Sequence, residues 1–457
     1  MSASGFRGSL VALGVTAGVS FALAGSAAGC DGDTDLSATL NDGGNEADAT
    51  PRDAGPRTIV TTLAPRLTSA PAVKASATWA AYRLDDGEWH TLAPESEGSY
   101  AFPLAVARWT LALVCASPDD ELTTVAIHHR TSATSVVELT LDEYCTPAPP
   151  PAEYAFTGTL TNIPTTTQWF DFGYARTSRG EAIPVSGATG TYEIVGIEPG
   201  TWDLSFAVRD EPFRPITRFV MKRGAVVTSD AIIDVDLTGP GSFAPGSKSL
   251  QLHSLVTGDT VTPVVFYGAG GPLGIDVGPQ DVPDGQPDVT LAYSTVPAAV
   301  QAATDRYYGE LMAEQDRRTG SRMISFDVHE PIDLDMTFLP DPPVAPVVVV
   351  ATSPHVRLET KLAVLPNAER HEVMALAARN RRTQLGWRST YDAPSVGTAT
   401  LVTDVTPDLS ALAGWKPAWG LPTGVATTVF VTAFETPKAL GDGKMQRSAS
   451  KGQVVTP

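Results

Sequence analysis

Short alternating runs of apolar and polar residues occupy most of the chain from residue 58 onward. Residues 79–82, 109–113, 125–127 and 427–434 are examples, each rich in aromatic and β-branched side chains, and turn sequences such as Asp85-Asp86-Gly87 separate such runs. A period of two is typical of a strand with one buried face, and regularly spaced short strands are typical of sandwiches and barrels. The pattern predicts an all-β fold of tandem antiparallel β-sandwich domains.

Two proline-rich stretches divide this β region. Residues 146–152 read Thr-Pro-Ala-Pro-Pro-Pro-Ala, and residues 340–346 contain four more prolines. Proline-rich segments are stiff and extended, so they serve as linkers. We therefore expect β-sandwich 1 (58–145), β-sandwich 2 (153–253), β domain 3 (254–339), β domain 4 (346–437) and a disordered polar tail (438–457).

Residues 368–380 have a helix-like composition of Ala, Glu, Met and Leu. Their apolar residues also alternate, and Asn380-Arg381 can turn a hairpin into the next run, residues 383–387. A helix and a strand therefore both fit this window, and the alternation favours strands.

A hairpin pattern in the middle of the chain is similar to a known module. The pattern is Gly190-x-Tyr192-x-Ile194, then Pro199-Gly200-x-Trp202-x-Leu204. It resembles the carboxypeptidase regulatory-like β-sandwich over residues 156–208. The resemblance implies a surface or accessory domain without catalytic residues.

The first β unit contains a similar hairpin pattern. Tyr100 precedes Trp109 at the spacing with which Tyr192 precedes Trp202, to within one residue. Chance similarity of two hairpins and a true repeat both explain the match. We favour a repeat, whose length fits two successive sandwich domains.

The first 30 residues read as an export signal. Arg7 is their only charged residue, residues 10–24 are largely apolar, and small residues 26–29 lead directly to Cys30. This is the three-part pattern of a secretory signal peptide, expected over residues 1–29. The small residues ending in cysteine resemble the lipobox of bacterial lipoproteins, which implies that Cys30 is lipidated and becomes the new N-terminus. A lipobox usually has Leu three residues before the cysteine, where this chain has Ala27.

Two other interpretations of the leader stay open. Ordinary cleavage fits Ala22-Leu23-Ala24 and residues 26–28, which both have the small-x-small form. A membrane-spanning helix is the second interpretation, and it needs about 20 predominantly apolar residues. Several Gly, Ser and Thr residues interrupt the apolar run, which argues against such a helix.

Residues 30–57 follow as an acidic, polar segment. They contain almost no large apolar side chain, so the segment cannot bury enough surface to offset the entropy of ordering, and we expect a disordered tether. The run Asp31-Gly-Asp33-Thr-Asp35 resembles the start of a calcium loop, but Leu36 stands where such a loop needs glycine. A solvated spacer is the simpler interpretation.

Charge and cysteine content narrow the partners and the compartment. The net charge of −19 argues against nucleic acid as a partner. With Cys30 lipidated, Cys115 and Cys145 remain, and in an oxidising compartment they are expected to form a disulfide. The bridge would close a loop of about 30 residues, worth roughly 3–4 kcal/mol in the chain-entropy model. Two buried free thiols are the alternative.

The usual catalytic motifs are missing from the sequence. His371-Glu372 begins a zinc-protease motif, but Ala375 stands where the second histidine belongs. His128 and His129 are adjacent on an expected strand and therefore point to opposite faces. We predict no catalytic residue, no cofactor and no metal site. Paired carboxylates of a glycosidase or a cation site remain an alternative, with these candidates: Asp327, Glu330, Asp333 and Asp335.

Trp415 and Trp419 are the remaining candidates for ligand contact. They lie four residues apart near Pro417 and could offer stacking faces for sugars, or they could pack the last domain's core. The sequence as a whole favours an exported protein, lipid-anchored in the outer membrane or at the cell surface, with a structural or binding role. Its expected partners are membrane lipid through Cys30 and an envelope protein or glycan. A carbohydrate-binding module and a polysaccharide hydrolase are the alternatives.

Overall fold

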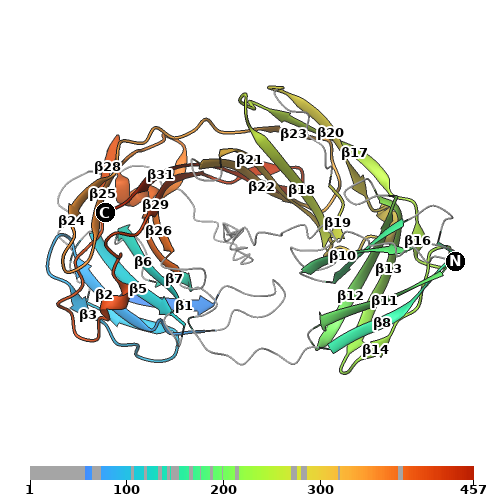
Figure 1. Cartoon of the computed structure of the whole chain (residues 1–457), viewed down its shortest axis with the longest axis horizontal. Helices are drawn as coiled ribbons and strands as arrows, with labels where there is room; N and C mark the ends of the chain where they lie inside the picture. The colour runs from blue at the N-terminus through green and yellow to red at the C-terminus, as the bar shows by residue number, and fades with distance from the viewer. Residues whose placement is uncertain are drawn as a thin grey trace, which may run out of the picture. The chain divides into compact units, whose positions relative to one another are not determined.

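Strands make up nearly all of the regular structure (Figure 1). The computed structural model describes residues 57–63, 74–103, 106, 108–117, 121–131, 136–141, 145, 154–163, 168–174, 177–185, 189–197, 199–210, 216–268, 275–278, 286–316, 320–378 and 384–457. Within these ranges there are one short α-helix, α1 (Ala393–Val396), and two 3-10 turns, η2 (Ala298–Val300) and η3 (Pro417–Trp419). None of the described helices has the length and apolarity needed to cross a membrane. The expected all-β fold is confirmed.

Sandwich 1 consists of two sheets around one core. In the first sheet, β1 (Arg57–Leu63) is antiparallel to β4 (Ser99–Phe102) and parallel to β7 (Val136–Leu141). The second sheet has the order β3-β2-β5-β6. Its strands are β2 (Trp79–Leu84), β3 (His90–Thr91), β5 (Arg108–Ala116) and β6 (Leu122–Thr131).

Sandwich 2 repeats this topology. Its first strand, β8, pairs antiparallel with β11 and parallel with β14 and β15, and its second sheet has the order β10-β9-β12-β13-β16. The strands are β8 (Tyr154–Thr161), β9 (Gln168–Tyr174), β10 (Thr177–Val185), β11 (Thr189–Ile197), β12 (Gly200–Arg209), β13 (Ile216–Val227), β14 (Ala231–Ile232), β15 (Val235–Asp236) and β16 (Ser242–Phe243).

Sandwich 3 repeats the topology again. Strand β17 pairs antiparallel with β20 and parallel with β23, and the second sheet begins β19-β18-β21-β22. The strands are β17 (Gly246–His253), β18 (Thr260–Gly268), β19 (Ile275–Asp276), β20 (Val289–Thr295), β21 (Arg306–Asp316), β22 (Gly320–Val328) and β23 (Leu334–Thr337).

Sandwich 4 keeps this plan with one change. Strand β25 pairs antiparallel with β28, as in the other units, but β24 lies antiparallel on its other side where they have a parallel last strand. The second sheet has the order β27-β26-β29-β31. The strands are β24 (Val348–Ala351), β25 (Arg357–Ala363), β26 (Ala368–Ala378), β27 (Gln384–Asp392), β28 (Leu401–Val405), β29 (Thr427–Glu435), β30 (Lys438–Leu440) and β31 (Gly443–Val455).

The second sheets of sandwiches 3, 4 and 1 are joined edge to edge in one sheet. Strand β22 of sandwich 3 pairs antiparallel with β31, and β27 of sandwich 4 pairs parallel with β6 of sandwich 1. The result is a continuous path from β19 to β3 (Figure 1). Because backbone groups at these edges are paired, the open edges that favour aggregation are removed at both joints.

The cores follow from the alternating pattern, and neighbouring sandwiches share parts of them: Ala207, Phe219 and Met221 of sandwich 2 are buried in the core of sandwich 3. Within sandwich 1, Trp109, Leu111 and Leu113 of β5 are buried towards β1, β4 and β7. The intervening residues of β5, Ala112 and Val114, face the other way and are buried with the core of sandwich 4. Strand β5 is therefore buried on both faces, which ties the first and last units together.

Three expectations about the chain are decided by these strands. Residues 368–378 form strand β26, as the alternation predicted. The predicted repeat is confirmed, because Tyr100 and Tyr192 lie on corresponding strands, β4 and β11. The disordered tail at 438–457 is wrong: β31 lies between β22 and β29, and its polar residues sit on a sheet whose opposite face is the core.

The expected boundary at residue 253 also needs correction. Strand β17 (Gly246–His253) pairs with β20 and β23, so it opens sandwich 3 rather than closing sandwich 2. Its alternating pattern resembles that of any half-buried strand, and its partners lie further along the chain.

Candidate functional site

The structure places the predicted cysteines in two different situations. Cys115, in β5, and Cys145, just after β7, form a disulfide with Cα atoms 4.6 Å apart. The pairing is as predicted, and the bond joins the two sheets of sandwich 1. Cys30, with the rest of the predicted leader and tether, lies outside the described residues.

The predicted stacking pair Trp415 and Trp419 does not form a sugar platform. The exposed fraction of Trp419 is 2%, and the two rings are nearly perpendicular, with an interplanar angle of 89°. Both pack in the core shared by sandwiches 1 and 4, near Trp79 and Trp387. The alternative, that these tryptophans pack the last domain's core, is the correct one.

The histidines considered as metal ligands have structural surroundings. His371 is fully buried, and its Nε2 accepts a hydrogen bond from the Leu365 N–H (3.1 Å). His129 stacks on Tyr391, with ring centroids 4.1 Å apart. His128 points to the opposite face of β6, as expected for neighbours on a strand. Among the described residues, no three His, Cys, Asp or Glu side chains are arranged to hold a metal ion.

The carboxylates considered for glycoside hydrolysis are engaged by different neighbours. The Asp327 carboxylate accepts a hydrogen bond from the Lys444 N–H, and that of Asp333 accepts from Ser249. Asp335 lies 3.0 Å from His253 on the exposed side of sandwich 3. Each is held by a different neighbour.

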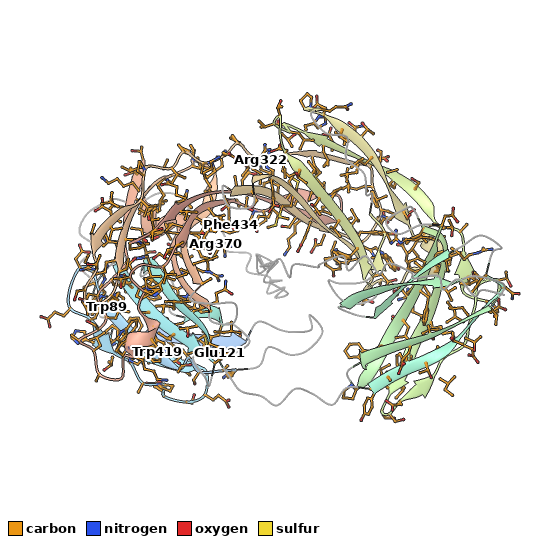
Figure 2. All side chains as sticks on the ribbon, in the orientation of Figure 1. Trp89, Glu121, Arg322, Arg370, Trp419 and Phe434 are labelled. Atoms are coloured by element: carbon orange, nitrogen blue, oxygen red, sulfur yellow. A yellow bond between two sulfur atoms is a disulfide. The ribbon has the colours of Figure 1, made fainter. Side chains whose placement is uncertain are left out.

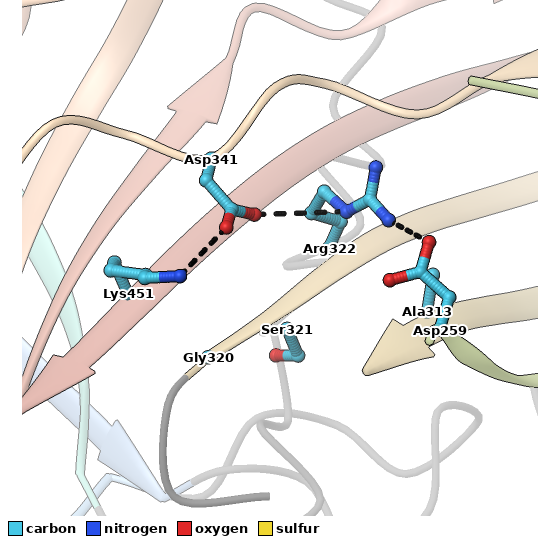
Figure 3. Close-up of a pocket in the computed structure, with 7 residues that line it drawn as sticks. All are labelled: Asp259, Ala313, Gly320, Ser321, Arg322, Asp341 and Lys451. Atoms are coloured by element: carbon cyan, nitrogen blue, oxygen red, sulfur yellow. Dashed lines mark hydrogen bonds and ion pairs between the residues drawn. The ribbon is translucent and has the colours of Figure 1, made fainter. Parts of the chain in front are cut away.

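A small polar hollow lies where sandwich 3 meets sandwich 4 (Figure 3). Arg322 of β22 is buried between two carboxylates, bonding to Asp259 directly and lying 3.7 Å from Asp341. Lys451 of β31 bonds to Asp341 at 2.9 Å. The hollow has room for about one water molecule, which is too little for a larger ligand. Its ion pairs therefore hold β22 of sandwich 3 against β31 of sandwich 4.

A larger cluster of charged residues lies on the face of the long sheet that points away from β24, β25 and β28. Paired residues of neighbouring strands share a face, and alternate residues along a strand share it too. The register pairs Arg370 with Asp392 and with Phe434, and Thr390 with His128. We call the following set the arginine face: His128 and Arg130 of β6, Arg388, Thr390 and Asp392 of β27, Arg370 and Glu372 of β26, and Thr432 and Phe434 of β29.

The opposite side of these strands explains why the cluster is held firmly. His371, Val373 and Ala375 of β26 alternate with the arginine-face residues and are buried, and Trp387 of β27 is buried beside them. The indole of Trp387 donates a hydrogen bond to the carbonyl of Trp419 (2.8 Å). Side chains on the arginine face therefore project from a packed sheet rather than from loops.

Two of the three arginines on this face have carboxylate partners. Arg130 bonds to Asp392 at 3.1 Å, and the exposed fraction of both side chains is 23%. Arg388 lies 3.4 Å from Glu372, which is buried. Arg370 instead lies over the ring of Phe434, with its guanidinium carbon 4.0 Å from the ring centroid, and Figure 2 shows the two side by side.

Three arginines of the arginine face stand against the carboxylates of Asp392 and Glu372, and Glu369 also acts on Arg370. Burial, together with Arg130 and Arg388, lowers the pKa of His128 to about 3, so its ring is neutral at pH 7. Burial also lowers the pKa of Arg370, although Glu372 opposes this; an arginine nevertheless stays charged. Buried nitrogens without a hydrogen-bond partner include Nδ1 of His128 and Nε of Arg130 and Arg370. Such a face is suited to hold an anion.

Sequence reasoning missed the arginine face for a physical reason. Arg130 and Arg370 are far apart in the chain, and no local motif links them. The available signal was charge at alternate positions of apolar strands, as in Arg388-x-Thr390-x-Asp392. That signal shows that one face of β27 is polar, but not which strand lies beside it.

Comparison with known proteins adds no family. No family model matches the chain, and none of the curated proteins matches it. Among solved structures, a DUF3823 family protein from Parabacteroides merdae has a TM-score of 0.15 and 9% identity, covering 57% of this chain and 92% of that one. The Bacillus anthracis TIE protein has a TM-score of 0.15 and 8% identity, covering 62% of this chain and 49% of that one. The description of the fold rests on the strands themselves.

Proposed function

We propose that the protein is a lipid-anchored, non-enzymatic component of the cell envelope, in the outer membrane or at the cell surface, that binds a partner through its β-sandwiches. The leader supports the anchor, because small residues lead directly to Cys30 and an acidic spacer follows it. A lipid on Cys30 needs a second contribution for stable attachment, which a second acyl chain supplies.

The observation that carries the binding role is the arginine face. It places three guanidinium groups on one side of a sheet whose other side is packed core. Rigid display of charged groups suits recognition, since little conformational entropy is lost when a ligand binds.

Two further arguments support a non-enzymatic role. The proposed similarity of residues 156–208 to the carboxypeptidase regulatory-like module implies an accessory domain. The charged side chains of the arginine face form ion pairs and a cation–π contact. His128, beside Thr390 in the register, has no hydrogen-bond partner at Nδ1, whereas a histidine base in nucleophilic catalysis is held by a third group.

The anchor is tested by changing Cys30 in the expressed full chain. Cys30→Ser should block lipid attachment and cleavage before residue 30, so the lipid-modified mature chain should disappear from the membrane fraction and only unmodified precursor should accumulate. Ser26→Ala, which keeps a small residue at the same site, is the matched control and should fractionate like the unaltered protein. A Cys30→Ser chain that is processed and stays in the membrane fraction would show that Cys30 is not the anchor.

The non-enzymatic part of the proposal has its own test. The purified protein is incubated with envelope polysaccharides, and new reducing ends are measured. We expect no increase over a heat-treated sample. Turnover that survives repurification would place the protein among polysaccharide hydrolases instead.

A further inference from the structure

We propose that the arginine face binds an oxyanion, a carboxylate or phosphate group of the partner, and that Arg370 makes the central contact. This inference rests on the proposed binding role but not on the lipid anchor. It follows from three features of the cluster. Arg370 has no carboxylate partner, the ring of Phe434 restrains it, and the neighbouring arginines already have carboxylate partners of their own.

The first feature is the pairing of charges. Arg130 is paired with Asp392, and Arg388 lies beside Glu372. Arg370 has no carboxylate within ion-pair distance among the described residues, and its Nε has no hydrogen-bond partner. A buried guanidinium nitrogen without a hydrogen bond is costly, and an incoming oxyanion would remove that cost.

The second feature is the orientation of Arg370. Its guanidinium lies over Phe434, whose exposed fraction is 4%. A guanidinium held over an aromatic ring has less freedom to reorient. A planar fork held in one orientation binds a carboxylate or phosphate through two parallel hydrogen bonds.

The third feature is the local potential. The chain has a net charge of −19, yet Arg130 and Arg388 both lie close enough to Arg370 to lower its pKa. The carboxylates of Asp392 and Glu372 are engaged by Arg130 and Arg388. An anion at Arg370 would have three arginines nearby, while the carboxylates of Glu372 and Glu369 also act on Arg370, in surroundings where charge interactions are stronger than in water.

Hydroxyl groups complete the surroundings of the proposed site. Thr390 and Thr432 flank Glu372 on the neighbouring strands, and both are buried. The hydroxyl of Thr432 donates to that of Ser450 on β31 (3.0 Å). Neighbouring strands are about 4.8 Å apart, so Arg130 and Arg370, two strands apart, can contact acidic groups about 10 Å apart on one ligand.

The test measures binding to the full-length protein in detergent at constant ionic strength. The probes are inorganic phosphate and a uronic-acid oligosaccharide, with chloride as the reference anion. We expect saturable binding of at least one probe, with phosphate alone indicating a phosphate ligand and the uronate alone a carboxylate ligand. Binding of neither probe would overturn the inference.

Variants assign the binding to Arg370. Arg370→Gln should weaken binding by about tenfold or more, because a charge-assisted hydrogen bond is lost, whereas Arg370→Lys should keep part of it. Arg218→Gln, on β13 of sandwich 2, is the matched control and should bind like the unaltered protein. Equal affinity for Arg370→Gln and the unaltered protein would overturn the assignment.

Phe434→Leu tests whether the aromatic ring orients Arg370, separately from any effect on folding. It keeps an apolar side chain on β29 but removes the ring, so it should weaken binding by a few-fold. Melting temperatures of all variants are compared first, so that only folded proteins are scored. If the unaltered protein is anchored and inactive towards polysaccharide but binds neither probe, this inference is rejected and the proposed anchoring and lack of enzymatic activity still stand.

Discussion

His253 should make the stability of sandwich 3 depend on pH. Its ring lies between two carboxylates, with Nδ1 2.8 Å from Asp288 and Nε2 3.0 Å from Asp335. The hydrogen bond with Asp288 is the main cause that raises the pKa of His253 above its ordinary value. A raised folded-state pKa means that the stabilisation is fully present below about pH 6.5 and is lost as the pH rises through the folded-state pKa.

Asp288→Asn tests this dependence. The variant should be less stable than the unaltered protein at about pH 5.5, and the difference should shrink towards zero above the folded-state pKa. Urea unfolding across this range, with an NMR titration of His253, measures it. Asp86→Asn, in an exposed turn, is the control. A stability difference that grows with pH would contradict the assigned sign.

Removal of the disulfide should loosen sandwich 1 selectively. The bond closes a loop of 30 residues between β5 and the end of β7, so the double change Cys115→Ala and Cys145→Ala should cost roughly 3–4 kcal/mol of local stability. Hydrogen exchange followed by mass spectrometry should show faster exchange in β1, β5 and β7, with the peptides of sandwich 2 as an internal control. Unchanged exchange in sandwich 1 would count against a stabilising bridge.

Single residues were predictable from the sequence to different degrees. The pairing of Cys115 with Cys145 followed from an even number of cysteines in an expected oxidising compartment. The role of Trp415 and Trp419 did not follow, because a tryptophan stacks on a sugar or packs a core with the same side chain. Burial decides between the two, and burial depends on Trp79 and Trp387, which lie in distant strands.

At the scale of elements, β31 should be essential because it joins two sandwiches. It pairs with β22 on one side and β29 on the other, and Ala449 within it is fully buried. Ala449→Asp buries an added carboxylate beside Arg322, whose guanidinium is already bonded to Asp259, and should cost more than about 3 kcal/mol. Val454→Asp on the same strand, where the exposed fraction is 51%, is the matched control and should be nearly neutral.

Thermal unfolding and limited proteolysis measure this effect. The Ala449→Asp protein should lose its protection in sandwiches 3 and 4 and keep it in sandwich 2. Equal melting temperatures for the two variants would mean that residues 443–455 contribute little to the fold, as a loosely attached tail would.

The strands themselves were largely predictable, and their pairing was not. Alternation identified β26, whose composition also suited a helix, because the period reports which face is buried. The parallel ladder between β6 and β27 could not be predicted from the sequence, because ladders use backbone groups that every residue has. For the same reason the polar strand β31 was mistaken for a disordered tail.

At the scale of the whole molecule, sandwiches 1 and 4 should depend on each other. They share a ladder through β6 and β27, and the Trp79 indole donates a hydrogen bond to the carbonyl of Ala413 (3.0 Å). A fragment of residues 58–145 would expose the β6 edge and the outer face of β5 to water. It should therefore aggregate or unfold without cooperativity.

A fragment of residues 154–243 provides the comparison. Sandwich 2 has an inner core of its own and no strand in the long sheet, although the outer face of β13 packs on sandwich 3. Because the inner core stays complete in this fragment, it should unfold as a cooperative unit. Circular dichroism during heating measures both fragments. Cooperative unfolding of the 58–145 fragment at the temperature of the full chain would contradict the shared core.

We propose that a lipid on Cys30 holds these four sandwiches at the envelope. Mass spectrometry of the mature N-terminal peptide from membranes of the expressing bacterium tests it most directly. We predict a peptide that begins at Cys30 and carries the added mass of a diacylglyceryl group. An unmodified peptide that begins at Gly29, after cleavage behind Ala28, or at any residue beyond Cys30 would contradict the claim.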